Sequence, residues 1–139
     1  MHKVLFSSAS EHWATPKATY DSLNAEFHFT LDPCPLNGEA TDGLSISWGG
    51  HRVYCNPPYG RGIDRWLVKA YEAELAVFLL PARTDTKWWH DYAMKANEIR
   101  FLRGRLRFGG AKYSAPFPSV ILIYKRHLEQ GIALQNAVA

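Results

Sequence analysis

Short apolar runs that end at proline or at polar turn residues divide much of the chain. Residues 29–32 and 52–55 end in this way, and residues 75–80 are apolar throughout and are followed by Pro81. Runs of this length bounded by turn signals are typical of buried strands. A strand that is apolar on both faces belongs to a sheet covered by helices. The pattern therefore predicts three strands of a largely buried sheet.

A helical pattern separates two of these strands. Residues 63–75 carry apolar side chains at a spacing of three and four, which makes one apolar helical face. Strand, loop, helix and strand over 52–80 then form a parallel crossover, which is right-handed in almost all proteins. A second helix is expected over 85–96, with Thr84 or Asp85 as its N-cap, followed by a short strand at 98–102.

Two more strands are expected near the end, at 105–108 and 119–124, with a loop rich in Gly, Pro and aromatic residues between them. The pattern predicts an α/β fold, a minimal Rossmann-like arrangement with a truncated, mostly parallel sheet of about five strands and an antiparallel C-terminal pair. We expect one domain over residues 1–139, with flexible ends at 1–9 and 127–139, the latter either a short helix or disordered.

Composition limits the class of protein. With 139 residues, 47% of them hydrophobic, the chain can bury one core but not two. The balance of 16 Lys+Arg against 13 Asp+Glu is compatible with a polyanionic partner without requiring one. No apolar run is long enough to span a bilayer and no secretory leader is evident, so we expect a cytoplasmic protein without membrane contact.

Cys34 and Cys55 are too few for a disulfide framework and are expected to be free thiols. Together with scattered histidines they do not form a pattern of metal ligands, so no metal site is predicted.

Candidate chemistry centres on Asn56-Pro57-Pro58-Tyr59, which follows the strand at 52–55. An exocyclic aryl amine is a poor nucleophile because its lone pair is delocalised into the ring. The side-chain oxygen of Asn56 and the main-chain carbonyl of Pro57 can accept hydrogen bonds from both N–H groups, and the two prolines fix the backbone. Tyr59 offers a face on which an extruded base can stack. The alternative is that the tetrapeptide is only a rigid turn after a strand.

Several further segments occur in a fixed order around this tetrapeptide. They are Trp13-Ala14-Thr15-Pro16, Phe29-Thr30-Leu31-Asp32-Pro33-Cys34, Asp42-Gly43-Leu44, Leu79-Leu80-Pro81-Ala82-Arg83-Thr84-Asp85-Thr86 and Ala115-Pro116-Phe117-Pro118-Ser119. In this order, over roughly residues 10–126, the chain resembles the phage-type DNA N6-adenine methyltransferases. The resemblance implies methyl transfer from S-adenosylmethionine to N6 of adenine in double-stranded DNA, in the cytoplasm of a bacterial host cell and in a restriction-modification setting.

The resemblance also implies where the cofactor binds. Residues ahead of the first strand and at its end become cofactor candidates: Trp13, Thr15, Pro16, Asp32, Pro33, Cys34 and Asp42. The chain departs from the family where Cys34 and its neighbours replace the usual glycine-rich loop. The segment between Asp32 and Asn56 is also too short for two helices and two strands, so the part of the sheet that carries the ribose-binding acid is missing. Asp42 or Glu39 is a candidate substitute, although Asp42 before Gly43 is equally a plain turn.

Basic residues are concentrated in the second half of the chain. Candidate DNA contacts are Arg83, Lys87, Arg103, Arg105, Arg107, Lys112 and Phe117. Phe117 is a candidate wall of the pocket for the target base, while the charged residues can equally be solvated strand positions.

Three alternatives stay open at this point. The Asn-Pro-Pro-Tyr chemistry also serves enzymes that methylate RNA, at guanine N2 or adenine N6, or a protein glutamine amide. A DNA-binding module that kept the fold and lost activity is a non-enzymatic alternative. Because a truncated sheet exposes an edge, we also expect a homodimer or a covering N-terminal segment.

Overall fold

The computed structural model describes residues 13–35, 42–108, 114–126 and 133–138. In these residues a mixed sheet has the strand order β1-β2-β4-β3-β5. Its strands are β1 (Arg52–Cys55), β2 (Leu75–Pro81), β3 (Glu98–Arg103), β4 (Ser119–Lys125) and β5 (Ala133–Val138). The β1–β2 and β3–β5 pairs are parallel, and β4 pairs antiparallel with both β2 and β3.

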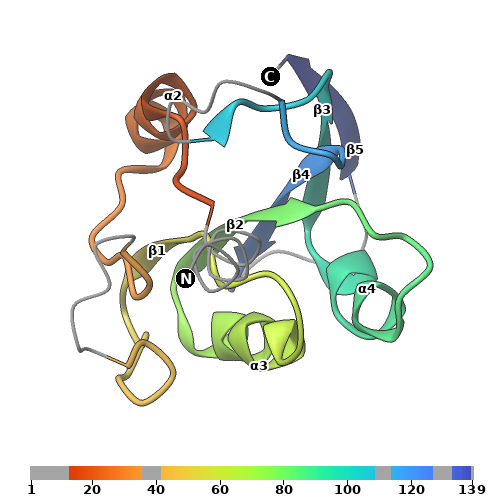
Figure 1. Ribbon diagram of the computed structural model, residues 1–139. Helices are drawn as coiled ribbons and strands as arrows, with labels where there is room; N and C mark the ends of the chain where they lie inside the picture. Colours follow the sequence, from red (N-terminus) through yellow and green to blue (C-terminus); the bar gives the residue numbers. More distant parts are fainter. Residues whose placement is uncertain (1–12, 36–41, 109–113, 127–132, 139) are drawn as a thin grey trace, which may run out of the picture.

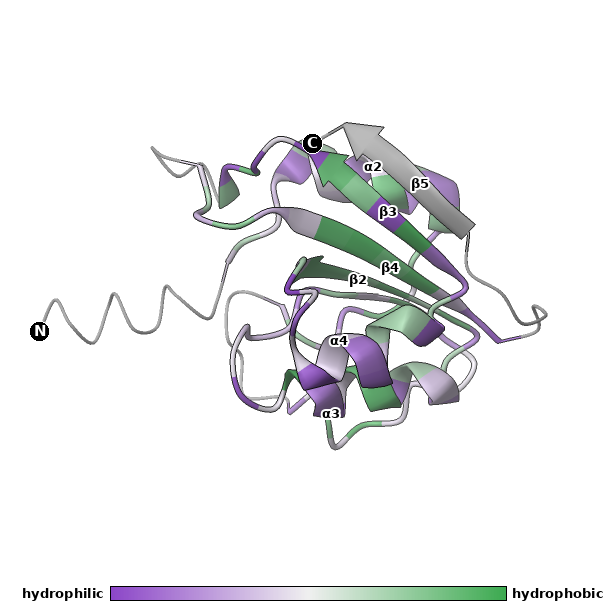
Figure 2. Cartoon of the chain, turned by 90° about the vertical axis from the view of Figure 1, so that its right-hand side faces the viewer, coloured by the Kyte–Doolittle hydropathy of each residue, from purple (hydrophilic) through white to green (hydrophobic). Residues whose placement is uncertain are grey.

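Helices cover both faces of this sheet (Figure 1). Helix α2 (Lys17–Phe27) lies on one face, while α3 (Ile63–Val68) and α4 (Lys87–Asp91) lie on the other. Short 3₁₀ turns, η1 (Lys69–Glu72) and η2 (Ala93–Lys95), continue these last two helices. Figure 2 shows the hydrophobic colour that runs along β2 and β4, the two strands at the centre of the three layers.

Strand alternation explains how both faces become apolar. On the α3 face, Phe78 of β2 lies opposite Leu122 of β4 and packs edge-on against Tyr124 at 5.7 Å between ring centres. On the α2 face, Tyr54 of β1 packs against Tyr20 of α2 at 5.1 Å. Successive side chains of a strand point to opposite faces, so buried strands need apolar residues at every position. Every residue of β2 is buried accordingly.

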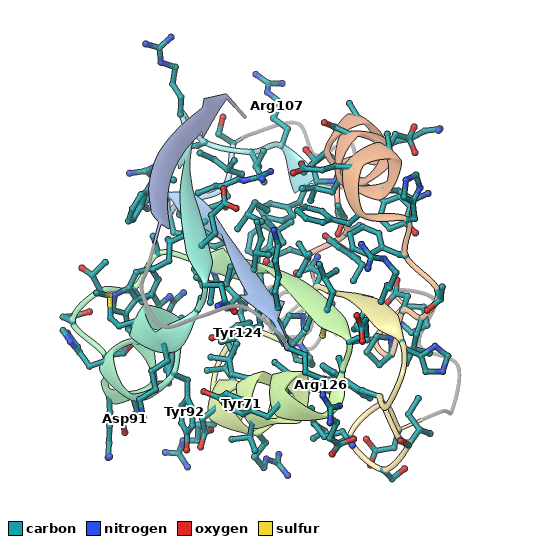
Figure 3. The ribbon with its side chains drawn as sticks, turned by 180° about the vertical axis from the view of Figure 1, so that it is seen from behind. Tyr71, Asp91, Tyr92, Arg107, Tyr124 and Arg126 are labelled. Atoms are coloured by element: carbon teal, nitrogen blue, oxygen red, sulfur yellow. The ribbon has the colours of Figure 1, made fainter. Side chains whose placement is uncertain are left out.

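A tyrosine cluster fixes the helices of the α3 face to the sheet. Figure 3 shows Tyr71, Tyr92 and Tyr124 close together at the junction of the helices with β4. The Tyr124 hydroxyl donates to the Tyr92 carbonyl at 2.8 Å, and the Tyr71 ring lies 6.1 Å from the Tyr124 ring. On the opposite face, the guanidinium of Arg100 on β3 pairs with Glu26 of α2 at 2.7 Å.

The α/β class and the β1–α3–β2 crossover are confirmed, but the predicted sheet is wrong in three respects. The sheet is mixed rather than mostly parallel, because β4 inserts between β2 and β3 in the opposite direction. Residues 105–108 form no strand, although Leu106 and Phe108 are buried and the arginines beside them are exposed. Residues 133–138 form β5, where a helix or disorder was expected.

Smaller differences concern the other elements. Residues 29–32 form only a single parallel bridge, from Leu31 to Val53, instead of a full strand. The second helix begins after Thr86, whose hydroxyl accepts from the Trp89 N–H at 3.3 Å, so Thr86 and neither Thr84 nor Asp85 is the N-cap. Helix α2 was not predicted. Its C-cap is His28, in the left-handed region with φ 54°, and the Asn24 side chain accepts from the Phe29 N–H just beyond it.

Candidate active site

The carboxyl ends of neighbouring strands bring the predicted site residues to one edge of the sheet. Asp32 follows the Leu31 bridge, Asn56 follows β1, and Arg83 follows β2 closely. Since β4 runs in the opposite direction, the residues just before it, including Phe117, reach the same edge. The main chain joins the two segments there, because the Ala82 N–H donates to the Pro118 carbonyl at 2.9 Å.

A cavity of about 360 Å³ opens at this edge, between the segment before α2 and the end of β1. Five of the predicted site residues line it, together with residues that were not predicted. The lining residues are Trp13, Ala14, Thr15, Lys17, Tyr20, Asp32, Cys34, Pro35, Tyr54 and Asn56. Four of the seven predicted cofactor residues and Asn56 thus surround one volume, whereas Pro16, Pro33 and Asp42 do not line it.

Asn56 is held by the segment that precedes α2. Its side-chain NH₂ donates to the Trp13 carbonyl and, at 3.1 Å, to the Thr15 hydroxyl. The Thr15 hydroxyl is also 2.5 Å from the Tyr54 hydroxyl. The Asn56 side-chain oxygen is buried and has no hydrogen-bond partner in the part of the chain that the structure describes. Leaving a buried acceptor unpaired costs about 1–3 kcal/mol, so this oxygen is poised to accept a donor from a ligand.

The other three residues of the tetrapeptide, Pro57, Pro58 and Tyr59, do not line the cavity. Pro57 is buried and Pro58 half-buried. The Tyr59 side chain is only 2% exposed, and its hydroxyl donates to the Leu79 carbonyl at 3.0 Å. Its ring packs edge-on against Phe117, at 5.7 Å between ring centres. Stacking of a base on Tyr59 stays a prediction, and it requires the neighbouring aromatic rings to move.

An aromatic cluster, formed by Trp13, Tyr59, Phe108 and Phe117, closes this side of the site. Trp13 lies 5.4 Å from both Phe108 and Phe117, measured between ring centres. The Arg83 guanidinium lies over the Phe117 ring at 5.8 Å. Phe117 does not line the cavity, but it packs against Trp13, which does, and its role as a wall of the base pocket stays a prediction. Of these rings, Phe108 was not predicted as a site residue.

Two ionisable groups in the cavity wall have raised pKa values. The protein around the cavity partly desolvates the Asp32 carboxyl and raises its pKa, although the side chain stays exposed through the cavity mouth. The Cys34 N–H donates to this carboxylate at 3.0 Å and partly offsets the rise in pKa. Burial and the Asp32 charge raise the pKa of the Cys34 thiol to about 11. Cys34 is therefore a neutral, weakly polar wall residue at neutral pH.

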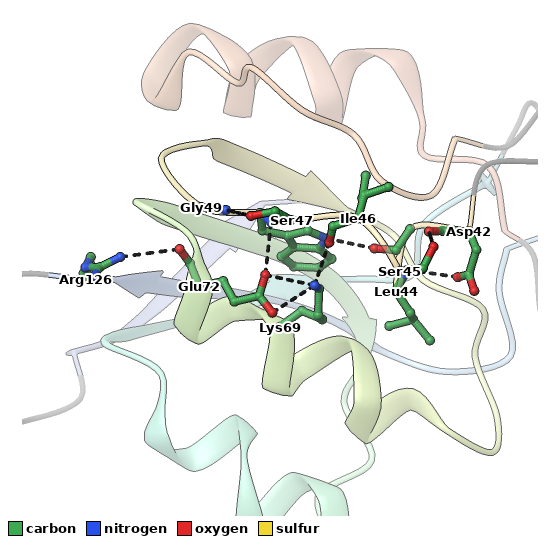
Figure 4. A network of polar contacts seen from close by, with 11 residues as sticks. Asp42, Leu44, Ser45, Ile46, Ser47, Gly49, Lys69, Glu72 and Arg126 are labelled. Atoms are coloured by element: carbon green, nitrogen blue, oxygen red, sulfur yellow. Dashed lines mark hydrogen bonds and ion pairs between the residues drawn. The ribbon is translucent and has the colours of Figure 1, made fainter.

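The Asp42 turn supports the Asp32 loop from outside the cavity. Figure 4 shows the polar network of this region, in which the Asp42 carboxylate accepts from the Leu44 N–H at 2.9 Å. Asp42 does not line the cavity, and its contacts are those of a turn residue. Gly43 packs so closely that an added Cβ would lie 2.1 Å from the Pro33 carbonyl oxygen. Its own carbonyl accepts from the Trp48 indole at 2.9 Å.

Basic residues lie around the same edge. Arg83, Arg103, Arg105 and Arg107 are exposed, and Figure 3 shows Arg107 at the far end of the molecule from Arg126. Lys87 is less suited to bind a ligand, because its ammonium already pairs with Asp91 at 2.7 Å. Lys112 and Glu39 lie outside the described residues.

Tyr20 and Tyr54 are the main site residues that the sequence did not predict. Tyr54 precedes Asn56 by two residues and therefore points to the same face of the sheet, but within an apolar run it reads as a core residue. Tyr20 lies one turn into α2, so its place in the cavity depended on recognising that helix. Across the described residues, no group of three or more His, Cys, Asp or Glu side chains is placed to hold a metal ion. No helix in that part of the chain has the length and apolar character needed to cross a bilayer.

Comparison with family models shows the family to which the chain is similar. The model of the family described as DNA N-6-adenine-methyltransferase (Dam) matches residues 4–136. A search among curated proteins finds no match. The matched range includes the whole edge described above, from Trp13 to Phe117.

Proposed function

Because the chain belongs to the DNA N-6-adenine-methyltransferase (Dam) family, we propose that it transfers a methyl group from S-adenosylmethionine to N6 of adenine in double-stranded DNA. Membership of the family implies methylation of adenine N6 in DNA as a general activity. The observation that carries the proposal for this chain is the buried, unpaired side-chain oxygen of Asn56 beside a cavity at the carboxyl edge of the sheet.

The cavity has the size and the chemistry for the cofactor. Its volume, about 360 Å³, falls within the range of about 300–1,000 Å³ that is usual for small-molecule pockets. Its lining offers a carboxylate, Asp32, for the ammonium group of a methionine moiety. The rings of Trp13 and Tyr20 offer apolar faces for a purine. S-adenosylmethionine supplies the methyl group on a sulfonium.

In this proposal the residues of the chain activate and position the amine. The Asn56 side-chain oxygen and the Pro57 carbonyl accept hydrogen bonds from the two N–H groups of adenine N6, which draws the nitrogen toward tetrahedral geometry. The freed lone pair would then take the methyl group that bound S-adenosylmethionine supplies, with the thioether as leaving group, and the nitrogen would lose one proton to water. Positioning and preorganised acceptors supply the rate enhancement. Neither a metal nor a covalent enzyme intermediate takes part in this scheme.

The basic residues of the same edge are proposed to hold DNA. Arg83, which lies over Phe117 of the aromatic cluster, and the exposed Arg105 are proposed to contact phosphates near an extruded adenine. Phe117, which lies between Trp13 and Arg83, is proposed to form the wall of the base pocket. A homodimer remains a prediction, testable by light scattering.

A labelled-methyl assay tests the proposal. Wild-type protein with tritiated S-adenosylmethionine should label duplex DNA, and digestion of that DNA should yield N6-methyladenine by mass spectrometry. Asn56→Ala should lose this transfer and still unfold in one cooperative thermal transition, while the matched variant Asn97→Ala should remain active. Label in RNA or protein instead of DNA would show that DNA is not the substrate and would identify the one that is. Absence of transfer, with DNA still retarded in a mobility shift, would favour a binding module.

A further inference from the structure

The orientation of the Asn56 amide decides whether the site can act on an amine. A primary amide presents an acceptor on one side and a donor group on the other, and a flip of 180° exchanges them. An amine substrate needs the oxygen. In this chain the NH₂ side faces the Trp13 carbonyl, a group that can only accept hydrogen bonds. A flipped amide would bring two acceptors together there, so this contact favours the productive orientation.

Thr15 provides the second contact that distinguishes the two orientations. Its hydroxyl accepts from the Asn56 NH₂ at 3.1 Å. The same hydroxyl lies 2.5 Å from the Tyr54 hydroxyl, and either of the two can donate to the other. Burial raises the pKa of Tyr54, so the phenol keeps its proton at neutral pH. In either direction of that bond, an oxygen lone pair of Thr15 remains available to the Asn56 NH₂.

Local structure brings these three side chains together. Tyr54 and Asn56 are two residues apart at the end of β1 and so point to the same face of the sheet. On that face, Thr15 directly precedes Pro16, the N-cap of α2. Tyr20 of α2 packs edge-on against Tyr54, which keeps the start of the helix above the strand. The contacts of Thr15 with Tyr54 and Asn56 therefore join the end of β1 to the segment before α2.

We propose that Thr15 is a positioning residue for methyl transfer. Together with the Trp13 carbonyl it holds the NH₂ of Asn56, so that the side-chain oxygen faces the target amine, and Tyr54 holds Thr15 in place. This inference rests on the proposed function and assigns Thr15 a role in the chemical step in addition to its place in the cavity wall. The unpaired oxygen of Asn56 is the independent observation that points to a ligand on the other side of the amide.

Three variants test this role. Thr15→Val keeps the shape and removes the hydroxyl, Thr15→Ser restores the hydroxyl, and Thr19→Val makes the same change on α2 outside the cavity. We expect Thr15→Val to lower kcat for DNA methylation at least about tenfold, as expected for a misplaced reacting group, with a KM for S-adenosylmethionine within about threefold of wild type. Thr15→Ser should recover most of kcat, and Thr19→Val should match wild type.

The alternatives give different results. A raised KM with unchanged kcat would make Thr15 a cofactor contact only and would overturn the proposal. Failure of Thr15→Ser to recover kcat would indicate a purely structural role and would overturn it as well. If wild-type protein methylates no DNA, the proposed function fails, and chemical unfolding of Thr15→Val, Asn56→Ala and the double variant still decides the geometry. Non-additive losses support the contact, whereas additive losses refute it.

Discussion

Gly43→Ala should damage both the stability of the protein and its cofactor site through one steric contact. The added Cβ would lie 2.1 Å from the Pro33 carbonyl oxygen and 2.8 Å from the Pro33 carbonyl carbon. Real Cβ atoms essentially never approach closer than 3.0 Å, so the two segments must separate by about 1 Å. Gly43 has little freedom to retreat, because it is buried and its carbonyl binds the Trp48 indole.

The magnitude follows from what moves. Overpacking of a buried contact costs about 1–3 kcal/mol of unfolding free energy. Pro33 lies between Asp32 and Cys34, both of which line the cavity. A displacement of about 1 Å would therefore move both of these residues of the proposed cofactor site. We therefore expect a loss of stability together with weaker binding of S-adenosylmethionine.

Urea unfolding and calorimetric titration of S-adenosylmethionine measure the two effects. Gly49→Ala is the matched control, because its nearest atom would be a serine side-chain oxygen at 3.2 Å and nothing closer. The steric argument is refuted if Gly43→Ala and Gly49→Ala unfold at the same urea concentration and bind the cofactor equally well. Loss of stability alone, with unchanged cofactor binding, would show that Trp48 moves instead of Pro33.

Three further changes have defined outcomes. Tyr124→Phe removes the donor to the Tyr92 carbonyl and should lower the unfolding free energy by about 1–2 kcal/mol in urea; an unchanged midpoint would contradict this. The Cys34 thiol, with its pKa raised to about 11, should react with iodoacetamide about 100-fold more slowly at pH 8 than a model thiol and speed up only as pH approaches 11, by mass spectrometry. Arg83→Ala should lower the slope of log affinity for DNA against log salt concentration by about 1, as expected for the loss of one phosphate contact. Arg126→Ala, at the opposite edge of the sheet, should leave this slope unchanged.

The sequence predicted those parts of the fold in which the local pattern of apolar residues is sufficient to determine the secondary structure. The run at 75–80 is apolar at every position, and β2 is buried at every position. Residues 105–108 show the limit of such patterns, since Leu106 and Phe108 alternate as in a strand but are buried without a strand partner. β5 contains Gln135 and Asn136, and its pairing with β3 comes from tertiary structure that local propensity does not encode.

The site was predicted to a similar extent. Asn56 and Asp32 meet at one cavity, because chain direction places the carboxyl ends of parallel strands at one edge, and the segment around Trp13 also lines that cavity. Tyr54 was not predicted, because a tyrosine in an apolar strand carries no sign of the polar contact made by its hydroxyl. Asp42 shows the converse case, in which an acidic residue near the site serves a turn.

The insertion of β4 between β2 and β3 has a consequence for how the chain folds. β2 and β3 are separated by a short helical connection, yet neither pairs with the other; both pair with residues 119–125. The centre of the sheet therefore cannot close until this late segment has left the ribosome. Until then β2 presents a long apolar edge, which is the kind of surface that chaperones bind and that promotes aggregation. Closure of such distant pairings is slow, so we expect the rate of folding to depend on when β4 docks.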